Sequence, residues 1–127
     1  MQEYIYEPDI DYFKSIFKMF NYDDIDLNFL QEQLKNYTIQ FRRMILNMNY
    51  NEPTKENGLP YISIKNYICY EAARLLTVNF VSNSDLINFI RTESLRLKEL
   101  AIKDLSKIVI DENSYDSVRL EGSIKKP

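Results

Sequence analysis

The spacing of apolar positions predicts a helix in the middle of the chain. Between Leu59 and Leu76, apolar residues recur at spacings of three and four, the period of one helical face: Ile64, Ile68, Ala72 and Leu75. Further apolar residues widen that face around most of the circumference: Tyr67, Tyr70, Leu76 and Val78. A helix that is apolar on most sides lies inside a bundle. We therefore expect a central helix, with Ser63 as its N-cap residue.

Three other segments show helical periodicity. One begins at Asp9 as N-cap and has its apolar side extending to Phe20. Another, from Asp26 to Met48, has seven apolar residues in heptad spacing: Leu27, Leu30, Leu34, Tyr37, Phe41, Met44 and Met48. That spacing suits a coiled coil between molecules or a long helix within a bundle. We favour the bundle, because three heptads are the lower limit for predicting a coiled coil.

The last helix is expected to begin at Ser84 as N-cap and to reach Ile108. A helix of that length spans about 37 Å. A globule of this size has a radius of gyration of only about 14 Å. The helix should therefore run the whole length of the domain.

Both ends of the chain depart from this period. Residues 1–8 alternate weakly up to Pro8, which predicts an N-terminal arm, extended or a short strand. Residues 110–127 are expected to form an extended C-terminal arm with a period of two after residue 117. The fold class predicted is thus all-α, a bundle of about four helices at residues 9–109 with an extended C-terminal arm.

The C-terminal arm is the candidate partner-binding site. A lone strand has unpaired backbone groups, so it can pair with Tyr4–Tyr6 of its own chain, stay disordered, or add to a sheet of another molecule. We favour contact with another molecule, because a compact bundle offers the arm little room. The residues assigned to this contact are Val118, Arg119, Leu120, Glu121 and Ile124.

Composition favours a single soluble domain. The chain has 127 residues, of which 45% are hydrophobic and 28% charged. One cysteine, Cys69, excludes an intrachain disulfide and suggests a reducing compartment. The acidic N-terminus has no apolar run and no stretch approaches membrane-spanning length, so we expect neither a signal peptide nor a membrane partner.

Charge and residue types disfavour several kinds of chemistry. The net charge is −3 with no basic block, which disfavours phosphate binding, although a helix-turn-helix module with residues 63–80 or 84–98 as recognition helix stays an alternative. The chain has no histidine, so Cys69 lacks a partner for nucleophilic catalysis and is taken as a structural thiol. Helix capping explains Asp23, Asp24 and Asp26 better than a metal site does.

These considerations leave no catalytic, cofactor-binding or metal-binding residue to assign, and we expect the protein not to be an enzyme. Two charged features lie on the predicted helices. Glu71, the acid of the central helix, is expected to form a salt bridge with Arg74. Arg42 and Arg43 are the basic pair that a DNA-binding module would use.

The order of these elements resembles the adaptor, or connector, proteins that join the portal of a tailed bacteriophage to its tail. The likeness covers residues 26–125: a polar loop ending in Gly58-Leu59-Pro60, a helix with Ile68 to Leu75, a short loop at 82–85, a long amphipathic helix at 86–108, and an extended arm. The acidic helix from Asp9 to Phe20 departs from that pattern.

This resemblance implies a function in the neck of a virion. Proteins of that family form homo-oligomeric rings, commonly of twelve subunits, with an acidic channel through which DNA passes without sticking. It also implies that the arm docks on the portal or on a neighbouring subunit, and that portal and tail proteins are the partners. The alternatives are a small phage-encoded regulator or inhibitor that binds a host protein through the acidic N-terminal surface, and the DNA-binding module.

Overall fold

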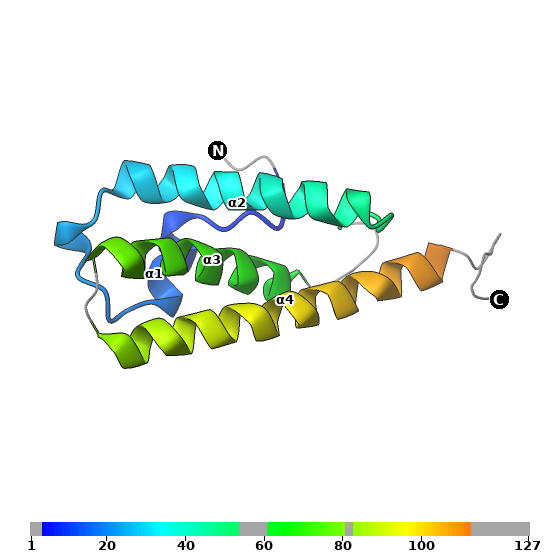
Figure 1. The fold of residues 1–127 in the computed structure, drawn as a ribbon. Coiled ribbons are helices and arrows are strands. Elements are labelled where there is room, and N and C mark those ends of the chain that lie inside the picture. The colour runs from blue at the N-terminus through cyan, green and yellow to red at the C-terminus, as the bar shows by residue number, and fades with distance from the viewer. Residues whose placement is uncertain (1–3, 54–60, 81–82, 113–127) are drawn as a thin grey trace.

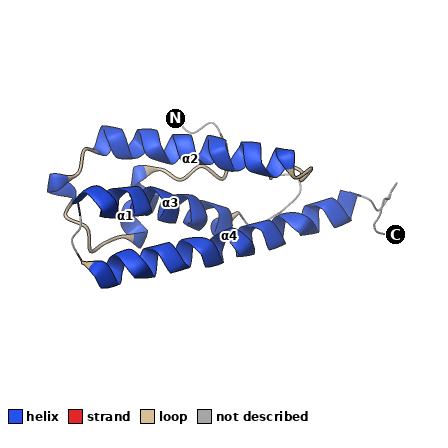
Figure 2. Cartoon of the chain, in the orientation of Figure 1, coloured by secondary structure: helices blue, strands red, loops and turns tan. Residues whose placement is uncertain are grey.

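Within residues 4–53, 61–80 and 83–112, which the computed structural model describes, every regular element is helical. The elements are α1 (Ile10–Ile16), the short 3-10 helix η1 (Tyr22–Asp24), α2 (Leu27–Asn47), α3 (Ile62–Phe80) and α4 (Ser84–Glu112). Figures 1 and 2 show α2, α3 and α4 side by side, with successive helices running in opposite directions. The predicted all-α bundle of about four helices is confirmed.

Helix α3 is the central helix, as its apolar pattern predicts. It contacts both α2 and α4, and α1 crosses it, with the Tyr12 hydroxyl donating to Asn66 Oδ1 at 2.6 Å. The residues of α3 buried in the core are Ile64, Ile68, Cys69, Ala72, Ala73 and Leu76. The two alanines leave room for close approach of the neighbouring helices.

The prediction that Ser63 is the N-cap of this helix is wrong. The helix begins at Ile62, and the Lys65 N–H donates to the Tyr61 carbonyl. The Ser63 hydroxyl instead donates to Asp104 Oδ2 of α4 at 2.7 Å. Ser63 is buried, so its hydroxyl is satisfied by the neighbouring helix and not by a free backbone N–H at the helix start.

Helix α2 packs against α3 of its own chain, as the bundle interpretation expects. Asp26 is its N-cap, accepting from the N–H groups of Asn28 and Phe29. The buried residues are Leu30, Leu34, Thr38, Phe41 and Ile45, so the second half of the stripe departs from the heptad positions at 37, 44 and 48. Thr38 can lie inside because its hydroxyl donates to the Leu34 carbonyl at 2.7 Å.

The N-terminal segment differs most from its prediction. Helix α1 has Asp9 as N-cap but ends at Ile16, before the expected Phe20. The chain leaves the helix at Phe17, and the Phe17 and Phe20 rings stack with centroids 5.2 Å apart. Residues 4–7 form a turn closed by the Glu7 N–H and the Tyr4 carbonyl at 3.0 Å, not the expected extended arm or strand, and Tyr6 is fully buried.

Helix α4 is longer than expected and passes beyond the other helices. Its 29 residues correspond to about 43 Å, and Figure 1 shows its C-terminal part extending past the ends of α2 and α3. Residues 110–112 are helical, although they were expected to open the extended arm. The predicted cap Ser84 is wrong by one position, since Asn83 Oδ1 accepts from the N–H groups of Asp85 and Leu86.

Candidate functional site

The five residues predicted to bind a partner, Val118, Arg119, Leu120, Glu121 and Ile124, lie outside the described residues. The Gly58-Leu59-Pro60 segment lies outside them too. The candidate sites that the structure offers are therefore on the helical body. Two features stand out, a cavity over α3 and the exposed apolar side chains of α4.

The first feature is a cavity of about 320 Å³ between α2, α3 and α4, which we call the α3 cavity. Its lining residues are Tyr37 of α2, Glu71, Arg74, Leu75 and Thr77 of α3, and Ile87 and Arg91 of α4. A smaller hollow of about 210 Å³ shares Tyr37 and Glu71 with it and extends along α2 to Gln40 and Met44.

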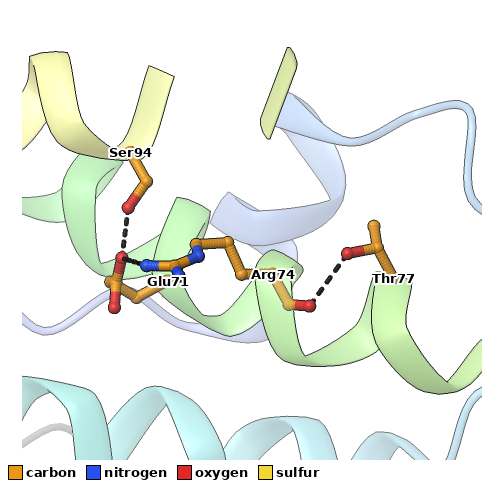
Figure 3. A network of polar contacts seen from close by, with 4 residues as sticks. All are labelled: Glu71, Arg74, Thr77 and Ser94. Atoms are coloured by element: carbon orange, nitrogen blue, oxygen red, sulfur yellow. Dashed lines mark hydrogen bonds and ion pairs between the residues drawn. The ribbon is translucent and has the colours of Figure 1, made fainter. Parts of the chain in front are cut away.

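Glu71 connects two of the helices that line the α3 cavity. Its Oε2 lies 3.0 Å from Arg74 Nη1, which confirms the predicted salt bridge, and the same oxygen accepts a hydrogen bond from the Ser94 hydroxyl of α4. Figure 3 shows both groups meeting on this oxygen. Ser94 is buried, so the contact holds α4 against α3 at a fixed register.

Thr77 completes this polar network along α3. Its hydroxyl donates to the Arg74 carbonyl at 2.8 Å (Figure 3), so it is occupied within the helix. The hydroxyls of Thr77 and Ser94 are thus both engaged. The donors with remaining capacity in the α3 cavity are on the arginines and on Tyr37.

Two tyrosines beside the α3 cavity are held in the protonated form. Burial, followed by the nearby charge of Glu71, raises the pKa of Tyr37. The same two causes raise the pKa of Tyr67 to about 12. Tyr37 lines the cavity, and a phenol is a hydrogen-bond donor at neutral pH.

The α3 cavity has an excess of positive charge. Arg74 and Arg91 both line it against a single acid, Glu71. Arg91 is exposed and forms no ion pair with any residue that the structure describes. The sequence pattern places Arg91 on a solvated, ion-paired face of the last helix and does not predict that Arg91 or Ser94 lies near Glu71, because only the packing of α4 on α3 brings them there.

Cys69 is not accessible to a substrate. It is fully buried on α3, and burial raises the pKa of its thiol. A buried thiol of raised pKa is a poor nucleophile. Among the described residues no three of the His, Cys, Asp and Glu type form a group that could hold a metal ion. Asp26 caps α2 and Asp24 accepts a hydrogen bond from Asn21, so both have structural roles.

The second feature is a set of exposed apolar side chains on α4. Phe89 and Leu95 are 54% and 59% exposed, and Leu100 is also exposed. At the end past which α4 extends, the C-terminal end of α2 and the start of α3 expose Leu46, Met48 and Ile62. The residues of α4 buried in the core are Ile90, Leu97, Ala101 and Leu105.

Comparison with models of protein families, with curated proteins and with solved structures finds no match to this chain. None of the helices in the described ranges combines the length and apolar character needed to cross a membrane.

Proposed function

We propose that this protein is a structural subunit of an oligomeric assembly, of the type that joins a phage head to its tail. In this proposal, copies of the chain form a ring between portal and tail proteins in the virion, and DNA passes through its channel. The residues Val118, Arg119, Leu120, Glu121 and Ile124 of the C-terminal arm would contact the portal or the next subunit. The order of helices and the polar connections between them support this assignment.

The observation behind the proposal is the length and surface of α4. A helix of about 43 Å extends past the rest of the bundle, and Leu95 remains exposed although the helix has its own buried side. The exposed Leu95 gives α4 an apolar contact point that a neighbouring subunit can cover. Contacts made by one end of a subunit on a different face of the next generate rings or filaments.

A truncation and a point variant test this proposal by light scattering during size-exclusion chromatography. The full chain is expected to run as an oligomer, and a chain ending at Glu112 to run as a smaller species with the same helical circular dichroism. Leu95→Gln should raise the dissociation constant of the oligomer about tenfold, because it removes one apolar contact from each interface between subunits.

Thr92→Gln is the matched control, since Thr92 is an exposed residue of the same helix and should leave the assembly unchanged. A full chain that is monomeric at all concentrations, and whose binding to a portal protein survives truncation at Glu112, would contradict the proposal. Recovery of one host enzyme rather than virion proteins from host extract would favour the regulator alternative instead.

The DNA-binding alternative gains no support from the central helix. Helix α3 packs against both α2 and α4 and buries its apolar residues in the core, whereas a recognition helix presents one side to a DNA groove. Of the arginine pair, Arg42 lies with its Nε 3.0 Å from Glu52 Oε1. A gel shift at low salt with the Arg42, Arg43 double alanine variant tests this alternative directly.

A further inference from the structure

The α3 cavity combines hydrogen-bond donors that described residues use only in part or not at all. The Tyr37 hydroxyl donates to no described residue, and Arg91 pairs with none. Arg74 uses Nη1 for Glu71, which leaves its other N–H groups available. Three donors, two of them on guanidinium groups, therefore line one cavity.

The one carboxylate of the α3 cavity is already engaged by a cation. Glu71 Oε2 accepts from both Arg74 and the Ser94 hydroxyl, and the Thr77 hydroxyl donates to the Arg74 carbonyl. With two arginines against one carboxylate, a cation would meet repulsion, whereas an anion would meet charge-assisted donors. The polarity of the cavity thus selects for negative charge.

The walls and size of the α3 cavity add a second requirement. Leu75 and Ile87 line it with apolar surface, and its volume of about 320 Å³ lies at the lower end of the range for small-molecule sites. A bare ion would leave that surface in contact with water. An anion attached to a small apolar body would cover it and would still reach the arginines.

We propose that the α3 cavity is a binding site for an oxyanion attached to an apolar or aromatic body, with Arg91, Arg74 and Tyr37 holding the oxyanion. The chemistry is shared by carboxylates and phosphate monoesters. Guanidinium groups bind both in a bidentate manner. None of the lining residues is one of the side chains assigned to the assembly contacts above, Leu95 of α4 or the C-terminal arm.

Ligand-observed NMR with phenyl phosphate and with benzoate tests the proposal on the full-length protein and distinguishes the two sources of the oxyanion. Saturable binding is expected for at least one of them, with benzamide, the neutral analogue of benzoate, binding at least tenfold more weakly. Inorganic phosphate should compete, but more weakly than phenyl phosphate. The oxyanion that binds more tightly identifies the ligand class.

Variants locate the site on the protein. Arg91→Gln should weaken binding roughly tenfold or more, the size expected for one charge-assisted hydrogen bond, and Tyr37→Phe should weaken it several-fold. Arg43→Gln is the matched control, because Arg43 is an exposed arginine of α2 that does not line the α3 cavity. Thermal unfolding of each variant confirms that the fold is intact.

Three outcomes would overturn the proposal. The first is the absence of saturable binding of either aromatic anion. The second is equal binding of benzamide and benzoate, which would show that charge is not recognised. The third is an equal effect of Arg91→Gln and Arg43→Gln, which would assign the binding to the general charge of the protein and not to this cavity.

Discussion

The hydroxyl of Tyr6 connects the N-terminal turn to the bundle. It donates to Glu52 Oε2 at 2.8 Å, and the other oxygen of this carboxylate accepts from Arg42 Nε at 3.0 Å. The Tyr6 ring meets Phe41 edge-on, with centroids 6.3 Å apart, and Arg42 lies over the Tyr4 ring. Burial and the bond to Glu52 raise the pKa of Tyr6. The contact therefore joins residues 4–7 to α2 and to the segment after it.

We expect Tyr6→Phe to lower the free energy of unfolding by about 2 kcal/mol, the usual contribution of a hydrogen bond to a charged group. The ring packing is retained, so the loss isolates the hydroxyl. Urea unfolding followed by circular dichroism measures the change. Tyr4→Phe is the control, because no described residue is hydrogen-bonded to the Tyr4 hydroxyl, and equal losses in the two variants would contradict this role of Tyr6.

At the residue scale, the sequence predicted contacts between near neighbours and missed those made by folding. The Glu71–Arg74 salt bridge follows from a spacing of three residues on one helix. Ser94 and Arg91 of α4 lie at the α3 cavity together with Glu71. Glu52 accepts a hydrogen bond from Tyr6, which is 46 residues away in the sequence. Only helix packing determines these partners, so no local pattern could identify them. The alternation of residues 1–8 predicted an extended arm or a short strand. In the structure residues 4–7 form a turn that buries Tyr6, and so short a pattern does not distinguish a turn from a strand.

At the scale of elements, apolar periodicity located the helices better than it located their ends. The central position of α3 follows from its apolar circumference, which no surface helix could have. A helix begins after the residue that acts as its N-cap, and several adjacent polar residues can fill this role. Asn83 and Ser84 are both residue types that are preferred at the N-cap, so the sequence does not choose between them. In α2 the buried stripe leaves the predicted heptad positions at Thr38. This polar residue can occupy a core position because its hydroxyl donates to the Leu34 carbonyl.

The cap of α4 is open to a direct test. Asn83→Ala should destabilise the protein by about 1 kcal/mol, because the N–H groups of Asp85 and Leu86 both lose their acceptor. Ser84→Ala should change stability by less than about 0.5 kcal/mol, since Ser84 is exposed and alanine favours the helix. Chemical unfolding of the two variants measures the difference, and the reverse order would place the cap at Ser84.

At the scale of the whole molecule, buried and half-buried tyrosines are distributed over the N-terminal turn, the segment after α1, and α3. The chain has ten tyrosines and no histidine. Burial raises the pKa of Tyr22 to about 12, and the Tyr22 hydroxyl donates to the Phe17 carbonyl at 2.6 Å. Burial also raises the pKa values of Tyr6 and Tyr67. Helix packing across the molecule therefore depends on neutral phenol groups.

This distribution predicts that stability falls in alkaline solution. In the unfolded chain a tyrosine ionises at about pH 10, whereas folded Tyr22 and Tyr67 keep their protons to about pH 12. Above about pH 10 the unfolded state binds fewer protons than the folded state, so the free energy of unfolding decreases as pH rises. The stabilisation is fully present below that pH and is lost progressively up to about pH 12.

Urea unfolding between about pH 9 and about pH 11 measures this slope. Tyr67→Phe isolates one contribution, because no described residue is hydrogen-bonded to the Tyr67 hydroxyl and the ring is retained. The variant should lose less stability over this range than the parent, since its unfolded state has one fewer phenol to ionise. An absorbance titration of tyrosinate in the folded protein provides the second measurement. Parallel slopes for parent and variant would show that Tyr67 ionises equally well in the folded and unfolded states, contrary to its position between Phe41 and Glu71.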